Sequence, residues 1–343
     1  MRVEQLTFTR FIAALIVVIF HFGSNVYPFS LDLFSFLFER GDVFVSYFFV
    51  LSGFVMVLAY SEKKIDYFKY LKRRVARIYP IHIVSLAILF ISYLLVSRNF
   101  PFFEFLIQSA LVHTWYPKYS LILNYPSWSL AVEVLFYVLF PFIIQFLKNN
   151  QVNNGVLVFG LWMSTQIISY LMVLFMREDS VWLFISFHPL MHLNEFLIGC
   201  FTALVYLSKP SISDSIKNFS LIFSATILLL LLKYPLLGVN YKNGFLAPVF
   251  SIIIYALSGI QGRVKKILSL PCLVILGEIS YALYILQVPV HNLSYYLFGQ
   301  INLRDPAVSF YLYLLVLMLC SYLSFFIIET PAKRFINSLN LFK

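Results

Sequence analysis

The chain has 343 residues, of which 61% are hydrophobic and only 12% charged, and its formal net charge is +10. A mean hydropathy of +0.86 excludes an ordinary soluble domain. Apolar runs of about twenty residues recur along the whole chain, and this pattern predicts a polytopic helical membrane protein.

The predicted architecture is all-α, with about ten transmembrane helices in one integral membrane domain, 1–343. The predicted spans lie near residues 6–27, 42–60, 78–97, 128–147, 155–176, 188–207, 218–234, 244–261, 272–298 and 307–329. Segment 101–113 is apolar but too short to cross upright, so we expect it to be re-entrant or interfacial.

Basic residues indicate the orientation. With the amino terminus inside, seventeen of the 25 lysines and arginines fall on the cytoplasmic side and seven on the outer side, so both termini are expected in the cytoplasm. The positive charge is therefore assigned to topology and lipid contact, not to nucleic acid. The first span is long and is not expected to be a cleaved signal peptide. The three scattered cysteines indicate neither a disulfide framework nor a metal cluster.

The first span, TFTRFIAALIVVIFHFG, carries Arg10 and His21. Eleven helical residues advance about 16 Å and make three turns plus about 20°, so both side chains share one face. Ionisable residues in a membrane span are functional candidates by default. Alternatively, Arg10 snorkels to the interface and His21 is a structural hydrogen-bonding residue.

The second span contains Ser52-Gly53, a small-residue surface that suits close helix packing. A polybasic segment follows and ends in RRVARIYP. Arg74 and Arg77 lie three residues apart, with Arg73 beside them, and arginine forks on one helical face suit phosphate groups. A plain topological role for this segment stays open. Tyr79-Pro80 is expected to close this short helix and start the third span.

The fourth span places Glu133 about five residues inside the outer border, and the sixth span carries Glu195. His188, His192 and Glu195 invite a metal interpretation, which Pro189 disfavours because it makes His188 extended. His21, Glu133 and Glu195 all lie roughly 8–11 Å from the outer ends of their spans at helical rise. A base and two carboxylates in one layer suit general-base chemistry.

The ninth span contains Pro289, which is expected to kink or break the helix beside Gln287. At the end of the tenth span, Glu329 and the basic pair Lys333-Arg334 are expected to stabilise the cytoplasmic end of the helix.

Seven motifs follow one another from residue 6 to about 335: Arg-x10-His at Arg10 and His21, FFVLSGF at 48–54, RRVARIYP at 73–80, WSLAVE at 128–133, EFLIG at 195–199, ISYALYI at 279–285 and ET-P at 329–331. In this order the motifs resemble acyltransferase family 3, integral membrane O-acyltransferases that modify bacterial cell-surface sugars. The resemblance implies a ten-helix domain with an acyl-coenzyme A donor, usually acetyl-CoA. It also implies that His21 is essential and that Arg10 and the pair Arg74 and Arg77 are functional. Two positions depart from the family pattern: Ser46 stands where an Asp is common, and Gln287 where a His is common.

These observations predict transfer of an acyl group, most simply acetyl, from acyl-CoA to a hydroxyl of a cell-surface or lipid-linked carbohydrate at the inner membrane. His21 is the expected base, Glu133 its orienting carboxylate and Arg10 a further catalytic residue; no metal is expected. The candidate donor-binding residues are Arg73, Arg74, Arg77 and Tyr79, and the candidate acceptor-binding residues are Trp128, Glu195, Tyr281 and Gln287. Three alternatives stay open: a covalent acyl relay, a homo-oligomer, and a different function in exporting a lipid-linked polysaccharide. A non-catalytic scaffold would leave the intramembrane charges unexplained.

Overall fold

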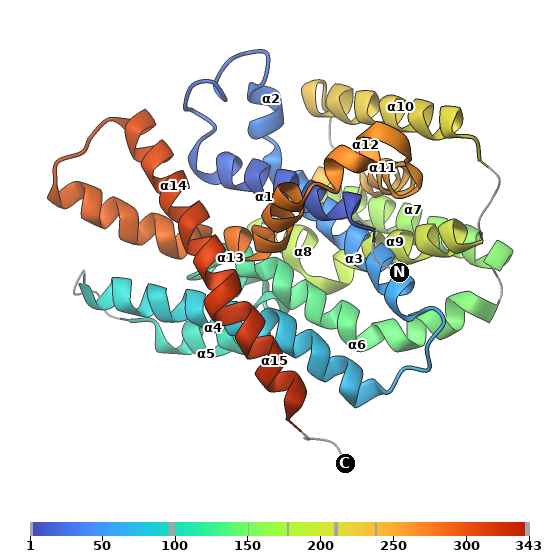
Figure 1. Ribbon diagram of the computed structural model, residues 1–343, viewed down its shortest axis with the longest axis horizontal. Helices are drawn as coiled ribbons and strands as arrows, with labels where there is room; N and C mark the ends of the chain where they lie inside the picture. The colour runs from blue at the N-terminus through green and yellow to red at the C-terminus, as the bar shows by residue number, and fades with distance from the viewer. Residues whose placement is uncertain are drawn as a thin grey trace.

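The computed structural model describes residues 3–95, 100–149, 151–176, 178–208, 212–236 and 239–339. Within these ranges the chain forms helices and turns and no strand, so the predicted all-α class is confirmed (Figure 1). The α-helices are α1 (Gln5–Phe22), α2 (Ser35–Phe38), α3 (Phe44–Tyr60), α4 (Tyr67–Leu95), α5 (Phe102–Ser109), α6 (Trp128–Asn149), α7 (Gln151–Phe175), α8 (Asp179–Phe187), α9 (Leu193–Leu207), α10 (Asp214–Lys233), α11 (Ala247–Gly259), α12 (Gly262–Leu268), α13 (Pro271–Gln300), α14 (Pro306–Ser324) and α15 (Thr330–Ser338).

Nine helices in the described residues are long and apolar enough to cross a membrane, and a tenth span results if α11 and α12 are counted together. These two helices meet at a bend of 101°. The prediction of about ten spans is therefore confirmed. Helix α5 has only eight residues and is not among the candidate spans, in agreement with the expectation that segment 101–113 is too short to cross.

Helices α1, α3, α9 and α13 form the centre of the bundle. The apolar window of α3 is 78% buried and that of α13 is 67% buried, whereas the corresponding values for α7 and α10 are 11% and 17%. Helix α3 packs closely against α9, because Gly53 faces the carbonyl of Phe196 and Gly199 faces the carbonyl of Val50 with no room for a Cβ atom. The predicted packing role of Ser52-Gly53 is thus confirmed.

Two helices continue through prolines where the sequence predicts an interruption. Helix α4 runs without a break through Pro80, so the predicted helix end at 79–80 is wrong. Helix α13 also runs through Pro289, so of the predicted kink or break the break does not occur. A helical proline leaves the carbonyl four residues earlier without its N–H partner, and neighbouring spans can supply a donor instead. Asn124 Nδ2 donates to the Ile285 carbonyl at 3.0 Å, four residues before Pro289.

Helix α6 shows the same arrangement at Pro141. The carbonyl of Tyr137, four residues earlier, accepts a hydrogen bond from the hydroxyl of Tyr70 on α4 at 3.0 Å. Side chains from distant parts of the chain thus keep α6 and α13 continuous, and they also connect these helices to their neighbours.

The carboxyl-terminal helix is longer than predicted. Helix α14 continues through a π-helical turn, Phe325–Glu329, into α15, so that one helical segment extends over Pro306–Ser338. It crosses α4 in Figure 1, and α15 packs against that helix. Glu329 and Lys333 are thereby brought to the amino-terminal part of α4, which carries the arginines of the RRVARIYP segment.

Candidate active site

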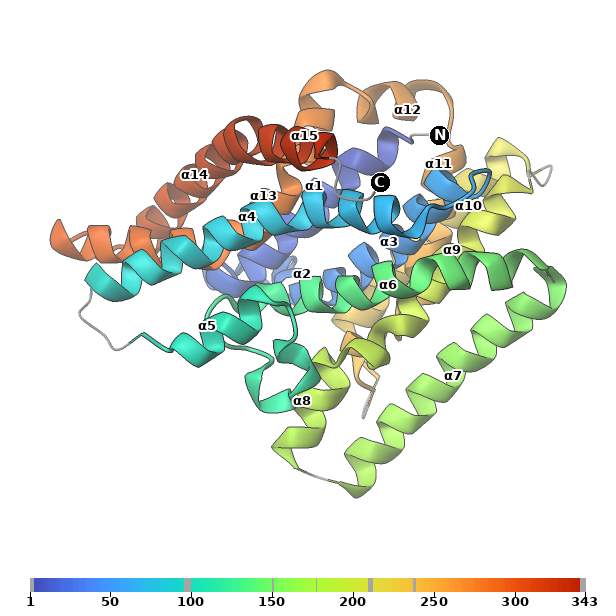
Figure 2. The ribbon, with the colours of Figure 1, turned by 90° about the horizontal axis from the view of Figure 1, so that it is seen from below.

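A cavity of about 840 Å³ lies between α1, α3, α4, α6, α13 and the carboxyl-terminal helical segment. Figure 2 shows these helices gathered around one side of the bundle, with α4 and α6 running past α1 and α3. Among the residues that the structure describes, eight charged ones line the cavity: Arg10, Arg74, Arg77, Glu133, Glu278, Glu329, Lys333 and Arg334. Of the predicted site residues, Arg10, Arg74, Arg77, Glu133 and Tyr281 line it.

The two arginines of the RxxR motif are held differently. The Arg74 guanidinium lies 5.7 Å from the ring centroids of Tyr60 and Tyr137 and 5.9 Å from that of Tyr70, and this aromatic cage fixes its position. Arg77 is exposed, and because it lines the cavity its guanidinium is accessible to a ligand there. Arg73 is also exposed but does not line the cavity, so the structure separates it from its two neighbours.

Glu133 faces the arginines of the cavity. Its Oε2 atom accepts a hydrogen bond from the hydroxyl of Tyr137 at 2.9 Å, and it lines the same space as Arg10 and Arg77. No hydrogen bond joins Glu133 to His21 among the described residues. The structure therefore brings Glu133 into one cavity with Arg10, another predicted catalytic residue, and shows no hydrogen bond from Glu133 to its expected partner His21 in the described residues.

His21 lies close to one end of this cavity, beside α6. Its ring meets that of Tyr125 edge-on at a centroid distance of 4.9 Å, and Tyr125 precedes the cavity-lining Ser129 by about one helical turn. Tyr284, which also lines the cavity, donates its hydroxyl hydrogen to the Pro126 carbonyl at 3.1 Å. His21 is partly exposed and lies outside the cavity lining; its contact with Tyr125, four residues before Ser129, connects it to that end, about 16 Å along α1 from Arg10.

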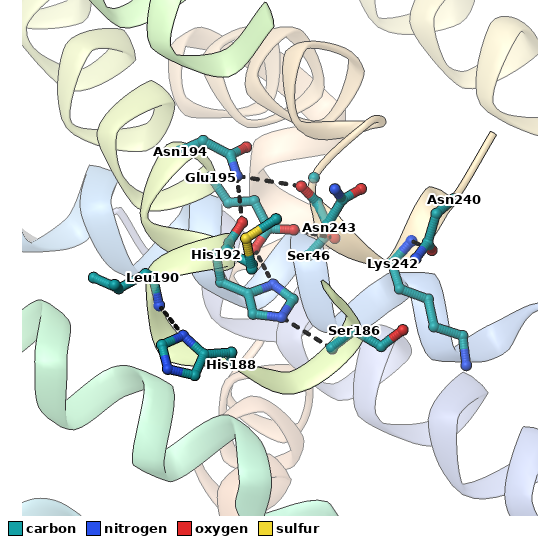
Figure 3. Close-up of polar contacts among 12 residues, drawn as sticks. Ser46, Ser186, His188, Leu190, His192, Asn194, Glu195, Asn240, Lys242 and Asn243 are labelled. Carbon is teal, nitrogen blue, oxygen red and sulfur yellow. Dashed lines mark hydrogen bonds and ion pairs between the residues drawn. The ribbon is translucent and has the colours of Figure 1, made fainter. Parts of the chain in front are cut away.

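Glu195 occupies a separate, fully buried cluster (Figure 3). Its carboxylate accepts a hydrogen bond from the Ser46 hydroxyl and lies 2.9 Å from Nδ1 of His192, whose Nε2 lies 3.0 Å from the Ser186 carbonyl. The carbonyl has no proton to offer, so Nε2 carries one, and a second proton is shared between Nδ1 and the carboxylate. His21, Glu133 and Glu195 are predicted to lie in one layer, but in the structure each has different neighbours.

Trp128 packs on this cluster. Its ring contacts those of His192 and Phe187 at 5.1 Å and that of Phe49 at 5.8 Å. Trp128 and Glu195 are both outside the lining of the large cavity, so their predicted contact with an acceptor has no support from this geometry.

Of the other predicted binding residues, Tyr281 lines the cavity, whereas Gln287 and Tyr79 do not. Tyr281 lines the cavity, and its hydroxyl donates to the Ile78 carbonyl at 2.6 Å, which joins α13 to α4. Gln287 is completely buried, and its Nε2 donates to the Tyr284 carbonyl at 2.7 Å. Tyr79 is partly buried and presents its ring edge-on to that of His82 at 6.1 Å.

Sequence reasoning missed part of the cavity. Glu278 is not among the predicted site residues, although it is an ionisable residue within a predicted span and could have been selected on that ground. Glu329 and Lys333 were expected only to stabilise a helix end, but they line the cavity together with Glu278. These groups meet because the carboxyl-terminal helical segment crosses α4 and packs against it.

Of the three residues considered for a metal, His192 and Glu195 lie 2.9 Å apart, but His188 does not complete a group with them. His188 has the extended backbone predicted from Pro189, with φ −74° and ψ 134°, and its Nδ1 accepts the Leu190 N–H at 3.4 Å. Over the described ranges, no group of three or more His, Cys, Asp or Glu side chains is arranged to hold a metal ion.

Comparison with known proteins identifies the family. Residues 3–326 match the acyltransferase domain of acyltransferase family 3. The chain is similar to the O-acetyltransferase OatA of Staphylococcus aureus, with 25% identity over 332 residues that cover 86% of this chain and 53% of OatA. It is also similar to the acyltransferase MdmB of Streptomyces mycarofaciens, with 26% identity over 326 residues that cover 87% of this chain and 81% of MdmB.

The chain thus spans about half the length of OatA. No solved structure matches the chain. The family match extends over nearly the whole chain and includes every helix that lines the cavity except α15. The protein is a multi-pass membrane protein that belongs to acyltransferase family 3.

Proposed function

We propose that this protein is a membrane O-acyltransferase of the inner membrane. It transfers an acyl group, most simply acetyl, from acyl-CoA to a hydroxyl of a cell-surface or lipid-linked carbohydrate. The observation that carries this proposal is the cavity of about 840 Å³, which has a cluster of basic residues in its lining and His21 next to its Ser129 end. The family match and the names of OatA and MdmB support the reaction class.

The basic part of the cavity suits the donor. Arg74, Arg77, Lys333 and Arg334 together offer guanidinium and ammonium groups that can bind the phosphates of coenzyme A, and guanidinium groups bind phosphate oxygens bidentately. Residues 73–77 and 333–334 are on the side predicted to be cytoplasmic, where this donor occurs. The long pantetheine arm then extends through the cavity toward Ser129, and the thioester lies near His21.

The reaction needs a base at the thioester. His21 takes the proton of the acceptor hydroxyl as its oxygen attacks the thioester carbonyl carbon. When the tetrahedral intermediate collapses, the C–S bond breaks, the acyl group remains on the acceptor oxygen as an ester, and the thiolate is protonated by the imidazolium. His21 is partly exposed, which leaves room for an acceptor from outside the bundle.

Glu133 and Arg10 support the donor side of this reaction. Both line the cavity, and the Glu133 carboxylate offsets the positive charge of Arg10 and Arg77 before the donor enters. Its hydrogen bond from Tyr137 holds the carboxylate in one orientation. We therefore assign Glu133 a role in balancing the charge of the arginines rather than in orienting the imidazole.

The test compares deletion cells with cells that carry the wild-type protein. The amount of surface glycan and its acyl content are measured by mass spectrometry on the same samples. We expect a normal amount of glycan that lacks its O-acyl groups in the deletion cells. Unchanged acylation would overturn the proposal, and a loss of glycan with normal acylation of the remainder would instead support the export function.

A further inference from the structure

A second cavity lies on the opposite side of the bundle from α14 and has no role in the proposed reaction. It has a volume of about 410 Å³ and is enclosed by α7, α9, α10 and α11, which lie together on the right-hand side of Figure 1. Its wall is formed mainly by apolar side chains such as Phe159, Phe201 and Ile252. An apolar cavity of this kind excludes water, because water would find too few hydrogen-bond partners there.

The helices around this cavity face the lipid of the membrane. The apolar windows of α7 and α10 are only 11% and 17% buried, so both helices present most of their surface to lipid. Val205 and Ile252 line the cavity and are 36% and 44% exposed, so the cavity is open at its side. The hydrocarbon chains of the bilayer are therefore the material in contact with this opening.

One end of the cavity is basic. Lys217 lines it with a side chain that is only 20% exposed and lies against Gly259, and its Nζ donates to Asp214 at 3.1 Å. An ammonium group has three donors, so this ion pair leaves capacity for a further anion. Asp214 itself is 65% exposed, and water screens its attraction for Lys217.

Helix α12 follows α11 close to this end in the chain, although none of its residues lines the cavity. It begins three residues after Gly259 and turns away from α11 by 101°, so it lies across the end of the membrane-spanning helices. It exposes Arg263, Lys265 and Lys266 together with the apolar Val264 and Ile267. A short helix with basic and apolar exposed side chains, lying across a bundle end, suits the headgroup region of an anionic membrane.

We propose that this cavity binds one acyl chain of an anionic glycerophospholipid, with the headgroup phosphate at Lys217 and the basic side chains of α12. The apolar wall excludes water and accepts the chain, and the basic groups at one end select a negatively charged headgroup. This site would tie α7 and α10, the two least buried of these helices, to the rest of the bundle.

The test uses the full-length protein in detergent, with native mass spectrometry as the readout. Phosphatidylglycerol and phosphatidylcholine with the same acyl chains are added separately, and we expect one phosphatidylglycerol to stay bound. Ser251→Trp fills the cavity from α11 and should remove this lipid. Leu161→Trp is the control, because Leu161 is a lipid-exposed residue of α7 that does not line the cavity.

A second variant tests the headgroup without adding bulk to the cavity. Lys217→Gln should reduce the preference for phosphatidylglycerol about fivefold, the effect of one lysine near an anionic membrane surface. Lys69→Gln is a matched control, because Lys69 forms the same i, i+3 pair with Asp66 at 3.2 Å but is remote from this cavity. Any of three results would overturn the proposal. The wild type retains both lipids equally, Ser251→Trp retains the lipid, or a polyprenyl lipid is bound in place of the phospholipid.

Discussion

Replacement of Arg77 by Ala is the sharpest test of the donor site. Arg77 lines the large cavity and is exposed to it, whereas Arg74 is fixed by three tyrosine rings. Arg74→Ala would therefore disturb packing as well as ligand binding, since cation–π contacts contribute to stability. Arg77→Ala removes a group whose surroundings are largely the cavity itself.

The expected magnitude follows from the bonds that Arg77 can donate to a phosphate. A hydrogen bond to a charged group contributes ~1.5–3 kcal/mol. We therefore expect the Kd of acetyl-CoA to rise roughly 10- to 150-fold, since each 1.4 kcal/mol is about tenfold in affinity. Arg77→Lys should restore part of the loss, because an ammonium group keeps the charge but not the bidentate geometry.

The assay is calorimetric titration of the purified protein with acetyl-CoA, CoA and pantetheine, which lacks the nucleotide phosphates. Arg73→Ala is the control, because Arg73 is the same residue type four positions earlier and does not line the cavity. The reasoning is refuted if Arg77→Ala binds CoA as tightly as the wild type. It is also refuted if Arg73→Ala weakens binding equally, or if pantetheine binding falls as much as CoA binding.

Three further substitutions examine the remaining site and the fold. His21→Gln should abolish acyl transfer but leave the Kd of CoA unchanged, because His21 lies outside the cavity lining; full turnover in this variant would remove the base from the mechanism. Glu133→Gln should lower kcat and also tighten CoA binding several-fold, because a negative charge that faces the donor phosphates is lost; an unchanged Kd in titrations would return Glu133 to a role at the imidazole. Tyr70→Phe should lower the free energy of unfolding by about 1 kcal/mol, because the Tyr137 carbonyl loses its donor. The cost should disappear in a Pro141→Ala background, where the helix supplies an N–H to the same carbonyl, and an equal cost in both backgrounds, measured by denaturant unfolding, contradicts this explanation.

Much of the fold follows from local sequence, because a membrane span needs only a long apolar run. The continuity of α13 at Pro289 has a specific physical cause. The effect of this proline depends on whether the Ile285 carbonyl finds another donor, and that donor is Asn124, 161 residues away in sequence. Local rules for proline cannot include such a partner, so they predict a kink or a break and cannot tell which of them occurs.

The site was predicted in part for a related reason. The arginine pair and Glu133 could be selected from their residue type and position in a span, and all three line the cavity. Depth along a span, however, does not fix the direction in which a side chain points. Glu195 and Glu133 have similar depths, yet one faces Ser46 and His192 in the interior while the other faces the cavity.

The π-helical turn at Phe325–Glu329 has a consequence for the charge pattern of the cavity. Such a turn contains one residue more than an α-helical turn, and one residue corresponds to about 100° of rotation about the helix axis. Below the turn, Lys333, Arg334 and Asn337 all face the cavity. Without the extra residue, α15 would present a different side to α4 and turn these groups toward the surroundings. The extra residue of this one turn thus adds the positive charges of Lys333 and Arg334 to those of the arginines that already line the cavity.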